Sequence, residues 1–85
     1  MYQQSIKLKF SDVTSHVERL LWIAALARRH PKYFRYSIEY SALGHESVLT
    51  ALAPDVWDDL VAKVQDAQAT GVLQVISPKS ITKSA

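Results

Sequence analysis

Three histidines and a short His-Glu-Ser run are the residues with the most evident capacity for chemistry. His16, His30 and His45 could ligate a metal ion, but none lies four positions from another, as two ligands on one helix face would. His45 and Glu46 could form an acid–base pair, but neighbours on a strand point to opposite faces. Ser47 has neither an orienting acid nor an oxyanion hole in the pattern. We therefore predict no catalytic residues, no metal, no cofactor and no enzymatic activity.

Cysteine and glycine usage narrows the chemistry further. The chain has no cysteine, which excludes disulfides, thiolate nucleophiles and cysteine-ligated metal. Its two glycines stand apart, whereas phosphate-cradling loops need several in a short span. Nucleotide hydrolysis is therefore disfavoured, and no small-molecule substrate is indicated.

Cations and aromatic residues are mixed over positions 28–35. Such a mixture suits contacts to phosphates and stacking on nucleic-acid bases. The candidate nucleic-acid residues are Lys7, Lys9, Arg28, Arg29, Lys32 and Arg35. Helix C-capping followed by solvated strand positions would recruit the same cations, so nucleic-acid binding is kept as an alternative.

Charge is divided along the chain. The 85 residues are 48% hydrophobic and carry a net charge of +2, but residues 1–35 hold seven basic and two acidic side chains, and residues 36–78 hold one basic and six acidic side chains. Opposed charged regions can orient a partner or a second copy of the chain. The acidic part would repel a polyanion, which ranks nucleic-acid binding second. Alternatively, these charges form a mixed, solvated surface with no binding role.

Hydropathy periods and capping residues predict six elements. Alternation of apolar and polar residues predicts strands, and Ser15 with Glu18, Pro54 and Gly71 are helix start and stop signals. The predicted elements are a strand at 4–10, a helix from Ser15 to Arg29, strands at 33–40 and 47–52 joined by a loop at 41–45, a helix at 54–70 and a strand at 72–76. This order predicts an α+β, ferredoxin-like βαββαβ sandwich, with a four-stranded antiparallel sheet and two helices on one face.

We expect one domain over residues 1–77 and a flexible polar tail over 78–85. No apolar run is long enough to cross a bilayer, and the first residues do not have the order of a signal peptide, so we expect a cytoplasmic protein with no membrane contact.

The first predicted helix is apolar on two sides. A turn of 100° per residue groups one apolar stripe, predicted to face the core, at Val13, Val17, Leu20, Leu21 and Ala24. Trp22 and Leu26 fall on the other side with Glu18, Ala25 and Arg29, and we predict that they form an exposed patch. Helix rotation or the tail folding back would instead cover this patch within one chain. In the second helix the predicted core stripe is Trp57, Leu60, Val61, Val64 and Gln68.

Together these features predict a small, non-enzymatic protein-interaction or regulatory domain that self-associates, as a homodimer, and binds a macromolecular partner. Trp22 and Leu26 are its predicted anchors, ringed by Glu18 and Arg29. The aromatic strand at 33–40 lies at a sheet edge and offers strand addition as a second route. The candidate partner-binding residues are Trp22, Leu26, Glu18, Arg29, Tyr33 and Arg35. The alternatives are a nucleic-acid-binding accessory protein and a small enzyme built on His45 and Glu46.

Overall fold

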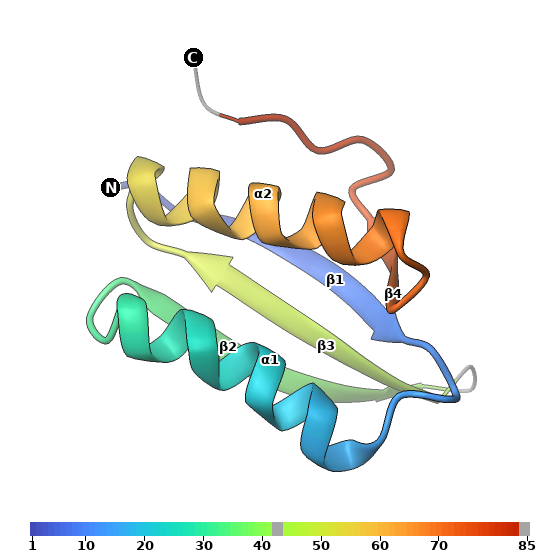
Figure 1. The fold of residues 1–85 in the computed structure, drawn as a ribbon. Helices are drawn as coiled ribbons and strands as arrows, with labels where there is room; N and C mark the ends of the chain where they lie inside the picture. The colour runs from blue at the N-terminus through green and yellow to red at the C-terminus, as the bar shows by residue number, and fades with distance from the viewer. Residues whose placement is uncertain (42–43, 84–85) are drawn as a thin grey trace.

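The structure is a computed structural model that describes residues 1–41 and 44–83. Its elements, labelled in Figure 1, are β1 (Gln4–Phe10), α1 (His16–Arg29), β2 (Phe34–Ser41), β3 (Gly44–Ala51), α2 (Pro54–Ala69) and β4 (Leu73–Ser77). The predicted α+β class, with a four-stranded antiparallel sheet and two helices, is confirmed. The element order is consistent with the predicted βαββαβ arrangement.

The strands lie in the order β2-β3-β1-β4, so β2 and β4 form the two edges of the sheet. Both helices cover the same face, with α1 on the β2 side and α2 on the β4 side, and the opposite face carries no helix (Figure 1). The predicted edge position of the aromatic strand agrees with this order. The ladder between β2 and β3 runs from Phe34 opposite Ala51 to Ser41 opposite Gly44 without a shift of register.

Local signals set the ends of both helices. The Ser15 hydroxyl accepts a hydrogen bond from the backbone N–H of Glu18 at 3.1 Å and caps α1 as predicted. Pro54 occupies the first turn of α2, where its missing N–H costs no hydrogen bond. The chain leaves α2 through Gly71, whose φ of +78° is readily available to glycine only. These caps explain why the sequence predicts the helix boundaries closely.

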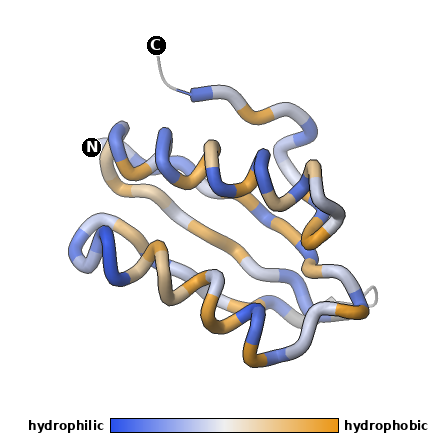
Figure 2. Tube along the Cα trace, viewed as in Figure 1, coloured by the Kyte–Doolittle hydropathy of each residue, from blue (hydrophilic) through white to orange (hydrophobic). Residues whose placement is uncertain are grey.

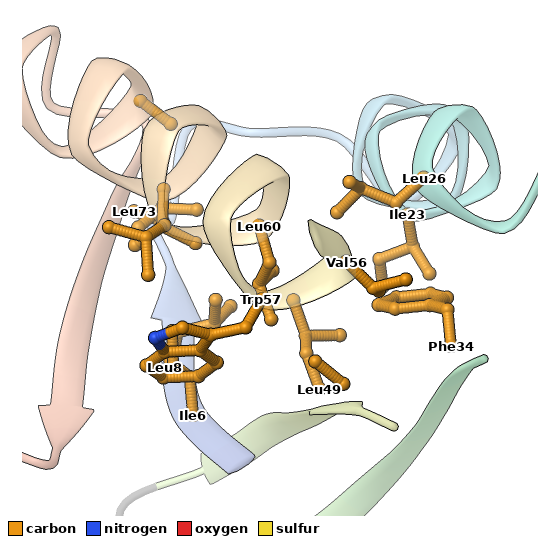
Figure 3. Packing of buried hydrophobic residues seen from close by; sticks show 14 of the residues in the cluster. Ile6, Leu8, Ile23, Leu26, Phe34, Leu49, Val56, Trp57, Leu60 and Leu73 are labelled. Carbon is orange, nitrogen blue, oxygen red and sulfur yellow. The ribbon is translucent and has the colours of Figure 1, made fainter. Parts of the chain in front are cut away.

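The core lies between the helices and the covered face of the sheet. Figure 3 shows Ile23 and Leu26 of α1 and Leu60 of α2 converging on side chains from all parts of the sheet. Hydrophobic residues are also frequent through β1, β3 and both helices in Figure 2. The fully buried side chains above the size of alanine are Ile6, Leu8, Leu26, Leu49, Val56, Leu60, Val61 and Val64. Burial of each of these contributes about 1.5–3 kcal/mol to stability.

The buried stripe of α2 is largely the predicted one. Trp57, Leu60, Val61 and Val64 are buried, but Val56 and Ala67 take the place that we assigned to Gln68, which is exposed. The stripe therefore begins one residue earlier than predicted. In the hairpin, β3 begins at Gly44 and is longer than predicted, and residues 42–43 of the predicted loop lie outside the described residues.

The segment after β4 runs along α2 (Figure 1). The indole Nε1 of Trp57 donates a hydrogen bond to the carbonyl of Thr82 at 2.9 Å, and Gln65 Nε2 donates one to the carbonyl of Ile81 at 3.4 Å. The Ile81 side chain packs against the core. Residues 81–82, which we predicted within a flexible tail, thus contact the second helix.

Candidate interaction surface

The buried side of α1 is opposite to the predicted one. Leu26 is fully buried, Ile23 is 4% exposed, and Trp22 is partly buried against the core. The Trp22 ring meets the Phe10 ring edge to face at 5.6 Å, and the Lys63 ammonium lies 5.6 Å from its centre. The prediction that Trp22 and Leu26 form an exposed anchor patch is therefore wrong. A fully buried Leu26 side chain cannot contact a partner.

The physical reason is that side chains in the middle and at the C-terminal end of α1 contact side chains of α2. Asp59 of α2 bonds His30 Nε2 at 2.8 Å and Arg29 Nη1 at 3.2 Å, which ties the end of α1 to α2. With that side of α1 turned inward, the predicted core stripe faces solvent. Its large members are exposed: Val13 by 93%, Val17 by 62%, Leu20 by 42% and Leu21 by 62%.

The exposed stripe of α1 continues onto the edge strand. Tyr36 and Ile38 are 52% and 45% exposed, although strand alternation puts them on the same face as the buried Phe34. Leu20 and Ile38 line one hollow between α1 and β2, so the helix and strand parts are contiguous. We call this surface the α1–β2 face and define it by Val17, Leu20, Leu21, Tyr36 and Ile38. Sequence reasoning found both apolar stripes of the helix and assigned them the wrong way round.

The hollow beside Leu20 and Ile38 has a volume of about 220 Å³ and a partly basic wall. His16 and Arg19 of α1 and His45 of β3 line it together. The Arg19 Nε is buried and has no hydrogen-bond partner among the described residues. Sequence reasoning missed this grouping because its members lie on two elements far apart in the chain. A buried polar atom without a partner costs about 1–3 kcal/mol.

Replacing Arg19 by an apolar residue of similar length is therefore expected to increase stability. Arg19→Met keeps an unbranched apolar stem and removes the desolvated Nε, so the free energy of unfolding should rise by about 1 kcal/mol. Urea denaturation followed by circular dichroism measures the change. Arg28→Met, at an exposed position of the same helix, is the matched control and should change stability by less than about 0.5 kcal/mol. A loss of more than about 1 kcal/mol in Arg19→Met would show that the guanidinium stabilises the fold.

The backbone of β2 is open on one side. The N–H of Leu52 donates to the carbonyl of Tyr33 at 2.8 Å, so this pair is a hydrogen-bonded pair of the ladder with β3. Bonded and non-bonded pairs alternate in antiparallel ladders. The backbone groups of Arg35, Ser37 and Glu39 therefore point toward β3, and those of Tyr36 and Ile38 point outward to the open edge.

Of the other four predicted partner residues, two lie at or near this edge and two do not. Tyr33 is 55% exposed, and Arg35 is exposed on the strand itself. Glu18 is exposed in the first turn of α1, beyond its backbone contact with the Ser15 cap. Arg29 is turned toward α2 by its ion pair with Asp59. Of these four residues, Arg35 lies nearest to the middle of the open edge.

The predicted nucleic-acid residues are spread over two faces and several elements. Lys7, Lys9 and Arg35 alternate with core residues and lie on the uncovered face of the sheet, whereas Arg28, Arg29 and Lys32 lie at the end of α1 and beyond it. Arg29 forms an ion pair with Asp59, and Lys7 forms one with Glu39 at 3.0 Å. A hydrogen bond and the charge of Glu39 raise the pKa of Lys7 above its ordinary value of 10.5, with a smaller contribution from Glu46.

Of the residues first considered for catalysis, His16, His45 and Ser47 line the same hollow, whereas Glu46 and His30 lie elsewhere. His45 lines the hollow on the helix side of the sheet, whereas Glu46 acts on Lys7, which lies on the uncovered side. His30, at the end of α1, bonds Asp59 and does not line the hollow that His16 lines. Within residues 1–41 and 44–83, no three side chains among His, Cys, Asp and Glu are grouped as metal ligands.

Comparison of the chain with protein-family models, curated proteins and solved structures finds no match. None of the helices in the described part of the chain has the length and hydropathy needed to cross a membrane.

Proposed function

We propose that this chain is a small, non-enzymatic protein-interaction domain, built as a ferredoxin-like sandwich, that self-associates through the α1–β2 face. The observation that supports this is the exposure of five large apolar side chains on two adjoining elements, between 42% and 62% each. Contact between water and such a contiguous apolar surface is unfavourable, so burying the surface against another protein would lower the free energy.

The size of the face suits a protein contact. Its five side chains are each 42–62% exposed, and contiguous apolar patches of roughly 300–600 Å² on small proteins are often functional. A standard interface buries about 800 Å² on each partner, of which about 60% is apolar. The α1–β2 face would supply apolar area to one side of such an interface.

Nucleic-acid binding through the basic residues remains the alternative function, and salt distinguishes the two. Binding that depends on phosphate contacts weakens steeply as the salt concentration rises, because the release of counterions from the nucleic acid then contributes less free energy. A contact centred on leucine, tyrosine and isoleucine should be nearly insensitive to salt or should strengthen. The dispersal of the cations over two faces is the reason for ranking this alternative second.

Leu20→Asp is expected to weaken self-association at least about tenfold, because it places a charge at the centre of the face beside Ile38. Sedimentation equilibrium at low and high salt measures the dissociation constant, and circular dichroism checks the fold. Ala62→Asp is the matched control, because Ala62 is exposed on α2, away from the face. A Leu20→Asp variant that associates as tightly as the unchanged chain would show that this face is not used.

A further inference from the structure

We infer that two copies of this chain join through their β2 edges, antiparallel about a two-fold axis at Ser37, so that two four-stranded sheets become one continuous eight-stranded sheet. This rests on the proposed function and names its partner, a second copy, and the contact that the two copies make. It is carried by the open edge, by the self-complementary residue pattern of β2 and by the uncovered apolar side chains above it.

The edge of β2 lacks the protection that edge strands usually have. Such strands are commonly short, interrupted by a bulge, or guarded by proline or by charged residues, above all lysine, against pairing with another chain. The charged residues of β2, Arg35 and Glu39, have opposite signs, so they oppose some pairings and favour others. β2 has eight residues, contains neither proline nor lysine, and pairs with β3 in an unbroken register. Its outward N–H and C=O groups can therefore continue the ladder with another strand.

The residues of β2 are complementary to those of a second, antiparallel copy of the same strand. If Ser37 faces Ser37 of the second copy, Arg35 comes opposite Glu39 and Tyr36 comes opposite Ile38. Both charge pairs then lie on the uncovered face, and both apolar pairs lie on the helix face. Opposite charges directly across a ladder stabilise it, and so do pairs of an aromatic and a β-branched residue.

Other registers lose this match. Because Tyr36 and Ile38 supply the outward backbone groups, the pairing can shift only by steps that keep these groups opposed. Such a shift places Ser37 opposite Arg35 or Glu39 and leaves no opposite-charge pair between the strands. The pairing centred on Ser37 also makes Arg35 and Glu39 a non-hydrogen-bonded pair, in which side chains lie closest.

The ion pair of Glu39 keeps its side chain on the sheet face where this pairing places it. The Glu39 side chain is 52% exposed, and its carboxylate bonds the Lys7 ammonium at 3.0 Å on the uncovered face of the sheet. An arginine from the second copy would reach it from the open side of β2. Glu39 would then lie between two cations, one from each chain.

The same axis brings the apolar parts of the α1–β2 face together. A two-fold axis perpendicular to the sheet leaves both α1 helices on the same face and makes them antiparallel. Leu20, beside Ile38, would approach the second copy over the joined strands. Tyr36 and Ile38 are half-exposed because α1 does not cover the outer side of β2, and the second chain would cover them.

A single cysteine at the axis tests this pairing. The chain has no cysteine of its own, so Ser37→Cys introduces one at an exposed position. In a non-hydrogen-bonded pair the two Cα atoms lie about 4.5 Å apart, within reach of a disulfide. Mild oxidation should convert the variant to a linked dimer at least about tenfold faster than a chance encounter allows, because pairing raises the effective concentration.

Ser5→Cys is the matched control, since Ser5 is exposed on the same sheet face but on the interior strand β1. It should cross-link only slowly. If the unchanged chain sediments as a dimer but Ser37→Cys does not cross-link faster than Ser5→Cys, the pairing is overturned while the proposed function stands. A chain that stays monomeric at high concentration, with no preferential cross-link, would overturn both.

Discussion

Leu26→Ala is expected to destabilise the fold by about 2–5 kcal/mol, whereas Leu21→Ala should change stability by less than about 0.5 kcal/mol. The two leucines are five residues apart on α1, but Leu26 is fully buried and Leu21 is 62% exposed. Truncating Leu26 loses its transfer free energy and leaves a cavity between the helices and the sheet (Figure 3). Truncating Leu21 only removes apolar surface from water.

Urea denaturation of the monomer, at a concentration below that of self-association, measures both changes. The pair is its own control, because the substitution and the helix are the same and only the facing side differs. Equal losses would show that α1 is rotated from its position in the structure. A stable Leu26→Ala with lost self-association would instead restore the first interpretation of Leu26 as an anchor.

The helix boundaries were predictable because the residues that set them act locally. The Ser15 hydroxyl reaches only as far as Glu18, Pro54 excludes a helical residue before it, and Gly71 supplies a positive φ at the end of α2. Each signal is readable within a few residues of the chain. The apolar stripe of α2 was also predictable in most of its members, because that helix has a single apolar side.

The orientation of α1 was not predictable in the same way. Two apolar stripes compete for the core on this helix, and the number of apolar residues favours the one that the structure exposes. The choice depends on contacts with residues far along the chain, Asp59 and Lys63, which tie the C-terminal end and the middle of α1 to α2. No local pattern reports such contacts, so the helix was identified while its buried side was assigned incorrectly.

The position of β2 at an edge follows from the element order, and its residue pattern can be read directly from the sequence. What the sequence could not show is that Tyr36 and Ile38 stay half-exposed on the side that carries the helices. That depends on how far α1 extends over the sheet. The candidate surface therefore combines a predictable edge with an unpredicted helix face.

Reversing the charge at either position 35 or position 39 of β2 is expected to weaken self-association. Mixing the two variants is expected to restore association, as a dimer of one copy of each. Arg35→Glu makes both positions 35 and 39 acidic, and Glu39→Arg makes both basic. Each variant alone would place like charges opposite each other twice, so its self-association should be weakened roughly tenfold or more at low salt. An equal mixture of the two would place an acid opposite a base at both pairs and should associate about as tightly as the unchanged chain.

Sedimentation of each variant and of the mixture, with one chain carrying a fluorescent label, measures this restoration. The recovery tests whether the charged residues of β2 face each other across the contact. The register itself is tested by the cysteine at position 37, because an acidic strand and a basic strand attract each other in any register. Raising the salt concentration should reduce both the loss and the recovery, since these pairs are exposed to solvent. Glu39→Arg also removes the bond to Lys7, so its fold is checked by circular dichroism. If the variants associate alone as tightly as in the mixture, β2 does not pair with its own copy in this register.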